Sequence, residues 1–150
     1  MAMDRADFFD DRGLGSPFYR VSVKAIARDD AGRVLAVADD TGTFELPGGG
    51  WEHRENFELA LRREIEEELG VAVENVGPLM FAYRGRDHRP FVWLRIVAEV
   101  TLKSYDFRLD QDEVTEARFV DREEFLALNW CELDREVLGY VDKLWPPVEN

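Results

Sequence analysis

The chain has 150 residues, and its 19 Lys and Arg against 32 Asp and Glu leave a formal net charge of −13. This length predicts one domain, over residues 17–150, which follows a polar N-terminal arm of residues 1–16. An apolar fraction of 45% indicates a packed core and excludes a disordered acidic tail. A surface this acidic repels nucleic-acid backbones, so we expect no nucleic-acid partner and a cation between the protein and any anionic ligand.

Cysteine content and hydropathy set the expected compartment. Cys131 is the only cysteine, so no intramolecular disulfide forms, and with two histidines it cannot supply a standard structural zinc site. The first eleven residues are acidic where a signal peptide is basic and apolar, and the longest apolar run, 91–100, contains two charged residues. We therefore expect no membrane segment and a cytoplasmic location. The oligomeric state, a homodimer included, is left open.

The first third of the chain reads as short strands. Apolar residues at positions 19, 21, 23 and 25 alternate with Arg20, Ser22 and Lys24, which predicts a half-buried strand. Further strands are expected over residues 34–38 and 44–46. Regular structure is expected to stop at Pro-Gly-Gly-Gly, residues 47–50.

The rest of the chain is expected to form one helix, then strands, then two further helices. A helix is expected after Asn56, a short helix capped by Asp121 near residue 122, and a last helix with an apolar face over residues 133–145. Strands are expected over residues 79–84, 91–102 and 116–120. The order of strands, helix, strands and helices predicts an α+β sandwich with a mixed sheet.

The helix after Asn56 carries acids on its apolar side. On a helical wheel Glu64 and Glu68 fall within the apolar arc and Glu67 lies at its edge. Crowded carboxylates at a poorly solvated surface are unfavourable unless a cation lies among them, and oxygen ligands suit Mg²⁺ or Mn²⁺. The alternative is a solvated acidic stripe paired with Arg62 and Arg63.

The sequence around this helix favours the metal site over the solvated acidic stripe. From Gly49 it reads GGWEHRENFELALRREIEEELGV, which fits the pattern G-x5-E-x7-R-E-U-x-E-E-x-G-U, where U is a bulky aliphatic residue, at all nine fixed positions. This segment resembles the Nudix box, and the chain is identified as a member of the Nudix hydrolase family. The matching residues are Gly49, Glu55, Arg63, Glu64, Ile65, Glu67, Glu68, Gly70 and Val71.

The resemblance implies both a fold and an activity. The fold is a Nudix-type α/β/α sandwich with a central mixed β-sheet. The activity is Mg²⁺- or Mn²⁺-dependent hydrolysis of the diphosphate linkage in a nucleoside diphosphate joined to another moiety, such as a nucleoside triphosphate or a nucleotide sugar. The only partner expected is this small nucleotide-type substrate. The rival is a catalytically silent Nudix-fold module that binds or senses nucleotides, against which the complete set of box acids argues.

By similarity, the box also assigns roles to its residues. The expected metal ligands are Glu67, Glu68 and the carbonyl of Gly48, with Glu64 as a further ligand or as the base that deprotonates water. Outside the box, Glu113 or Glu116 could supply that base instead. Arg63 is expected to orient the box acids in the catalytic site, and the structural positions of the motif are Gly49, Glu55 and Gly70.

Four further positions, within the box or after it, have expected roles of their own. Many family members have Gly where this chain has Arg54, so a looser turn is expected there. Trp51 is expected to pack in the core rather than to stack on a base. Tyr83 and Arg84, on a strand expected to face the box helix, are candidates for substrate binding. The identity of the substrate stays open.

Overall fold

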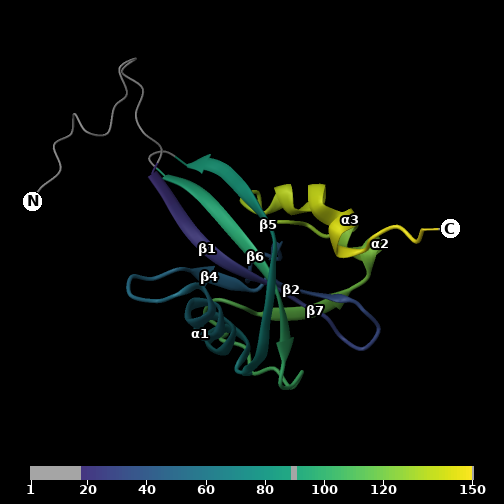
Figure 1. Ribbon diagram of the computed structural model, residues 1–150, viewed down its shortest axis with the longest axis horizontal. Helices are drawn as coiled ribbons and strands as arrows, with labels where there is room; N and C mark the ends of the chain where they lie inside the picture. The colour runs from purple at the N-terminus through teal and green to yellow at the C-terminus, as the bar shows by residue number, and fades with distance from the viewer. Residues whose placement is uncertain (1–17, 89–90, 150) are drawn as a thin grey trace, which may run out of the picture.

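The computed structural model describes residues 18–88 and 91–149, so the expected N-terminal arm lies outside the described residues. Figure 1 shows its elements, which combine strands with a few helices in an α+β arrangement. The strands are β1 (Phe18–Ala27), β2 (Val34–Ala38), β3 (Phe44–Glu45), β4 (Gly48–Gly50), β5 (Val73–His88), β6 (Phe91–Leu102) and β7 (Glu116–Val120). The helices are α1 (Phe57–Leu69), α2 (Arg122–Ala127), the 3₁₀ helix η2 (Arg135–Tyr140) and α3 (Val141–Leu144).

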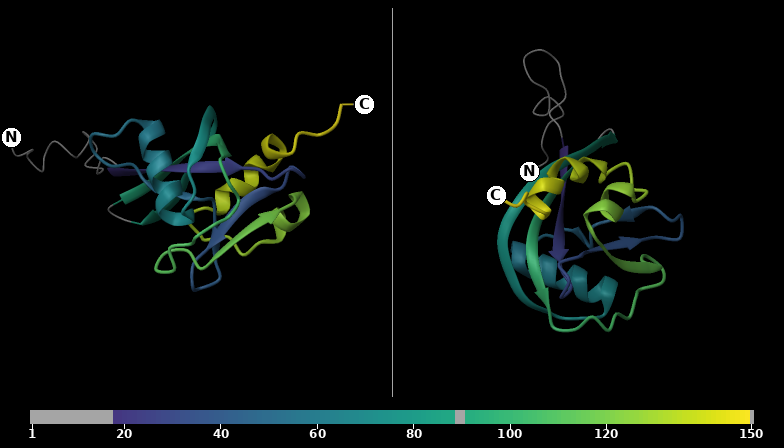
Figure 2. Two further views of the ribbon diagram at one scale, coloured as in Figure 1. Left: turned by 90° about the horizontal axis from the view of Figure 1, so that it is seen from below. Right: turned by 90° about the vertical axis from the view of Figure 1, so that its right-hand side faces the viewer.

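Two sheets form the centre of the domain. The larger has the order β4-β1-β6-β5, and the smaller has the order β3-β2-β7. In the larger sheet β1 runs parallel to β6 and antiparallel to β4, which confirms the mixed sheet. Figure 2 shows α1 on one side of β1 and the C-terminal helices on the other.

Strand β1 is covered on both faces. Val23 and Ala25 pack in the core under α1, while Ile26 packs in a second core shared with β2, α2 and η2. The expectation of a half-buried strand is therefore wrong: Ser22 is 1% exposed and Lys24 is 2% exposed. A central strand that pairs on both sides and has elements over both faces has no solvated face for its polar residues.

Helix α1 begins after Asn56, as its sequence predicts. The side chain of Asn56 accepts a hydrogen bond from the amide of Leu59 at 2.8 Å, which caps the first turn. Gly70 ends the helix with φ 64°, and a Cβ at Gly70 would lie 2.8 Å from the carbonyl oxygen of Arg108. Position 70 therefore requires glycine for two reasons: its left-handed backbone conformation and the lack of room for a Cβ beside Arg108.

Other boundaries differ from expectation. The glycines of β4 form a strand because they pair with β1, so the expected stop at residues 47–50 is wrong beyond Pro47. Strand β5 begins at Val73 rather than residue 79, and its pairing with β6 shifts register across Gly77 and Pro78. Proline is tolerated there because β5 lies at the sheet edge.

The C-terminal part contains two kinds of helix. The capping box of α2 is confirmed, with Asp121 and Glu124 each bonding the other's backbone amide. The single last helix expected over residues 133–145 is instead η2 followed by the short α3. Among the described residues, no helix is both long enough and apolar enough to cross a membrane.

Candidate active site

Arg63 joins the acids of the Nudix box. Its Nε and Nη2 donate to the two carboxylate oxygens of Glu55 at 2.5 and 3.0 Å, and Nη2 also donates to the carbonyl of Gly50 at 3.0 Å. Its Nη1 donates to Glu64 at 2.8 Å and to Glu67 at 3.2 Å. These hydrogen bonds raise the pKa of Arg63 above its ordinary value, with Glu55 the largest cause. One guanidinium therefore fixes the loop before α1 and two carboxylates on α1.

The carboxylate of Glu64, a residue of α1, lies against Gly49 of β4. Its side chain is 12% exposed, and a Cβ at Gly49 would collide with its carboxylate. Glycine at this position is thus what allows the strand to approach the acid. Burial raises the pKa of Glu64, and the hydrogen bond from Arg63 opposes that shift.

Glu68 lies one turn further along the buried side of α1. It is 4% exposed, and its Oε2 accepts a hydrogen bond from the amide of Gly48 at 3.0 Å. Burial raises the pKa of Glu68 to about 8, against the opposing effects of Lys24 and the Gly48 amide. The helix and β4 are therefore joined through a carboxylate that favours its protonated form unless a cation is near.

The donor set suits a hard divalent cation. Among residues 18–88 and 91–149, no three His, Cys, Asp or Glu side chains are grouped so that they could hold a metal ion. Glu64 and Glu67 nevertheless share one nitrogen of Arg63, and both belong to the same side of α1 as Glu68. Carboxylate and carbonyl oxygens, with no thiolate or imidazole among them, are the ligands that Mg²⁺ and Mn²⁺ prefer.

The loop between β6 and β7 folds over the end of α1. The amides of Arg108 and Asp110 donate to the carbonyls of Leu69 and Glu68, at 2.8 and 3.1 Å. Glu113 lies in this loop, with its amide bonded to the carbonyl of Asp110, and its side chain is exposed. The structure thus brings Glu113 to the end of α1 that carries Glu68. At the start of β7, Glu116 is paired with Arg118.

The two candidates for substrate binding lie apart from the box. Tyr83 is 4% exposed in the second core, and its hydroxyl donates to the carboxylate of Asp134 at 2.7 Å. Burial, and then the charge of Asp134, raise the pKa of Tyr83 well above its ordinary value. Arg84 is exposed and lines a hollow of about 420 Å³ together with Glu132 and Arg135.

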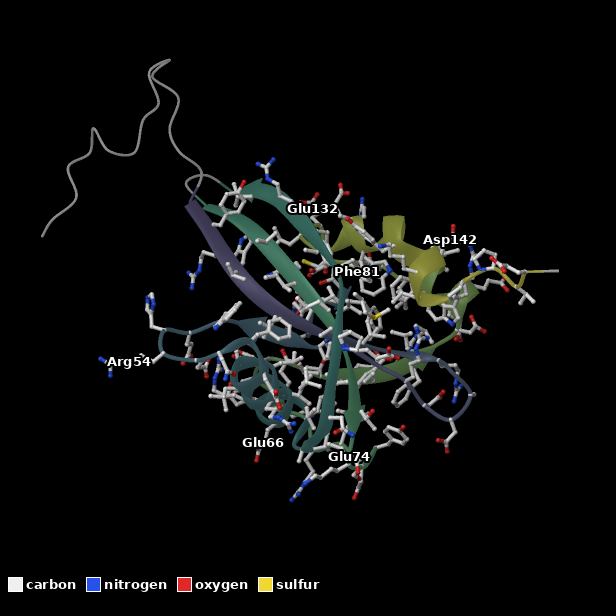
Figure 3. The ribbon with its side chains drawn as sticks, in the orientation of Figure 1. Arg54, Glu66, Glu74, Phe81, Glu132 and Asp142 are labelled. Atoms are coloured by element: carbon white, nitrogen blue, oxygen red, sulfur yellow. The ribbon has the colours of Figure 1, made fainter. Side chains whose placement is uncertain are left out.

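Trp51 is at the surface, so its expected place in the core is wrong. Its side chain is 37% exposed, meets Phe57 edge-on at 5.8 Å between ring centroids, and donates through Nε1 to the carbonyl of Glu55. It lines a hollow of about 680 Å³ whose other walls include Trp93. The neighbouring Arg54 has φ 70°, the left-handed turn that glycine favours, and Figure 3 shows its side chain pointing away from the domain.

Lys24 and Asp134 are buried charged residues whose burial the sequence does not indicate. Lys24 on β1 contacts the turn between β3 and β4, and Asp134 before η2 is fully buried against Tyr83 and Arg95. Strand alternation assigned Lys24 to a solvated face. Only the packing of β2, α2 and η2 against β1 shows that this face is covered.

Two curated relatives each match part of the chain. A MutT-like protein of Streptomyces ambofaciens is 44% identical over 59 residues, which are 39% of this chain and 38% of that protein. A nucleoside triphosphatase NudI of Escherichia fergusonii is 43% identical over 63 residues, 38% of this chain and 45% of that protein. The chain therefore spans less than half the length of the curated relatives it matches.

The fold and a family model agree with these local matches. The crystal structure of a MutT protein from Methanosarcina mazei superposes with a TM-score of 0.74 over 89% of this chain and all of that chain, at 21% sequence identity. The family model of the NUDIX domain matches residues 18–140, which hold both sheets, α1 and every acid described above. This chain belongs to the NUDIX domain family.

Proposed function

We propose that the protein is a hydrolase that uses Mg²⁺ or Mn²⁺ to cleave the diphosphate linkage of a nucleoside diphosphate joined to another moiety. One observation carries the proposal: Arg63 holds Glu55, Glu64 and Glu67 in a single array, with Glu68 on the next turn of α1. A domain of charge −13 needs a cation to hold a diphosphate, and we propose that this array binds it.

The proposed roles divide the array between binding and proton transfer. Glu67, Glu68 and the carbonyl of Gly48 would hold the cation, with Glu64 as a further ligand or as the acceptor of the proton from the attacking water. A bound divalent cation neutralises phosphate charge and makes water more acidic. Arg63 keeps the carboxylates in place, and Glu113 is the alternative proton acceptor.

Nucleoside triphosphates come first among the substrates to be tested. The name of the relative from Escherichia fergusonii supports them, although the matching segment covers less than half of that protein. Nucleotide sugars also belong to the proposed class. We further propose a cytoplasmic location, because the single Cys131 forms no intramolecular disulfide, and we take a homodimer as an assembly to be tested by light scattering.

The experiment is a hydrolysis panel with the full chain. Nucleoside triphosphates, nucleotide sugars, dinucleoside polyphosphates and ADP-ribose are each incubated with Mg²⁺ or Mn²⁺, and the products are separated by chromatography. We expect turnover of at least one class, with a nucleoside monophosphate among the products. Tight nucleotide binding without turnover of any class would instead support the silent binding module.

A further inference from the structure

We infer that Lys24, which lies outside the Nudix box, is a positioning residue that holds the carbonyl of Gly48 in place at the candidate metal centre. This inference rests on the proposed function, because it assigns Lys24 a role toward a ligand of that centre. It differs from a structural role in the core, which would affect folding and leave cation binding unchanged.

Lys24 is buried and points at the turn between β3 and β4. It is 2% exposed, and its Nζ donates to the carbonyl of Leu46 at 3.0 Å and to the carbonyl of Gly48 at 3.1 Å. The amide of the next residue, Ala25, donates to the carbonyl of Pro47 at 2.9 Å. Two consecutive residues of β1 thus bind three consecutive carbonyls of the turn.

Gly48 is held from its other side as well. Its amide donates to the carboxylate of Glu68, so its two backbone polar groups are bonded to a box acid and to Lys24. Its φ of 130° and its close approach to the carbonyl of Val23 both require glycine. The direction of the Gly48 carbonyl is therefore set by contacts on β1 and α1, not by the turn alone.

The ammonium of Lys24 lies near several carboxylates, Glu68 on α1 among them. Glu45 lies 3.4 Å from Nζ, and the buried Asp134 lies close enough to act on it electrostatically. A carbonyl oxygen has two lone pairs, so an ammonium donor on one leaves the other for a cation. Residues that orient metal ligands without touching the metal have measurable effects on metal affinity.

The matched comparison is made in a Glu45→Gln background. Replacing Lys24 alone leaves the carboxylate of Glu45 without its cation, which by itself is destabilising. The Glu45→Gln variant keeps the lysine and its two bonds to carbonyls. The Lys24→Met/Glu45→Gln variant keeps a side chain of similar length and removes the ammonium, with both its hydrogen bonds to carbonyls and its charge beside Glu68.

The measurement is the Mn²⁺ affinity of each protein, by electron paramagnetic resonance of free Mn²⁺ without nucleotide. We expect Glu45→Gln to bind like the parent, and Lys24→Met/Glu45→Gln to bind about tenfold more weakly, the lower end of what ligand-orienting residues contribute. If the double variant does not fold, Lys24→Leu/Glu45→Gln, whose side chain likewise has no donor, takes its place with the same expectation.

Equal affinity in the two Glu45→Gln proteins would overturn the inference and leave the proposed function standing. Tighter binding without Lys24 would also overturn it, because the ammonium would then compete with the cation. A parent protein that binds no Mn²⁺ would overturn the proposed metal centre and the inference together. The three results are distinguished within one titration series.

Discussion

Glu67 is the box carboxylate most open to solvent, and this makes it the sharpest test at the scale of single residues. Its side chain is 55% exposed, against 12% for Glu64, although both bind Arg63. An exposed carboxylate with one ion pair contributes little to folding. The cost of removing its charge should therefore fall on catalysis.

We expect Glu67→Gln to lower turnover about a hundredfold or more, since loss of a ligand charge weakens a cation worth several kcal/mol to the transition state. Its free energy of unfolding should stay within about 0.5 kcal/mol of the parent. Turnover and chemical denaturation measure the two effects. Glu66→Gln is the control, because Glu66 is exposed on the opposite side of α1, where Figure 3 shows it pointing outward. Equal losses in both variants would contradict a special role for Glu67.

The proton acceptor can be identified by a pair of substitutions. Glu64 is held on a rigid helix by Arg63 and lies against Gly49, whereas Glu113 is exposed in a loop. Rigid elements hold catalytic geometry better than loops, so we expect Glu64→Gln to cost about a hundredfold or more at saturating metal and Glu113→Gln less than about tenfold. The reverse order would assign the proton transfer to the loop.

At the scale of elements, the close contact of β4 with β1 gives a stability test. A Cβ at Gly48 would collide with the backbone of Val23, whereas a Cβ at Gly50 would meet nothing within 4 Å. Because the collision is with backbone, we expect Gly48→Ala to destabilise the protein by about 2 kcal/mol or more. We expect Gly50→Ala to change stability by about 0.5 kcal/mol or less. Thermal and urea unfolding check both values, and similar stability of the two variants would contradict the close packing of β4.

Elements with an unbroken local pattern are the ones that sequence predicts well. The expected bounds of β2, β6 and β7 match the structure, and so do the start of α1 and the cap of α2. The errors occur where tertiary contacts override local signals. The glycines of β4 form a strand only because β1 lies beside them, and β5 extends past Pro78 only because it has an exposed edge.

The same division holds for the site. The contacts of Arg63 with Glu55 and Glu67 join residues within one box, and their spacing is readable from the sequence. The burial of Lys24 and the exposure of Trp51 depend on what covers each face of β1 and on how the loop before α1 turns. Periodicity cannot report either, because it records alternation and not the partner.

At the scale of the whole molecule, the net charge and the two cores together predict that activity depends on a cation and that folding does not. The apolar side chains of the two sheets and their helices form two cores, so we expect the fold not to need a cation. We expect substrate binding to need one, since a chain of charge −13 repels a diphosphate. Removal of metal should thus separate activity from folding.

We expect metal to raise stability only through binding. A cation that binds the folded state alone stabilises it by RT ln(1 + [L]/Kd), about 2.7 kcal/mol at a concentration one hundred times the Kd. Differential scanning fluorimetry should show a midpoint that rises with Mn²⁺ concentration, and a smaller rise for Glu67→Gln. A midpoint independent of Mn²⁺ in the parent would contradict a metal centre in the folded domain.

The most direct test of the account is turnover of the best panel substrate during chelation and add-back of metal, followed together with circular dichroism. We predict that excess EDTA abolishes hydrolysis while the far-ultraviolet spectrum stays unchanged, and that Mg²⁺ or Mn²⁺ restores the activity. Full hydrolysis in excess EDTA would contradict the central claim that the acids of α1 act through a divalent cation.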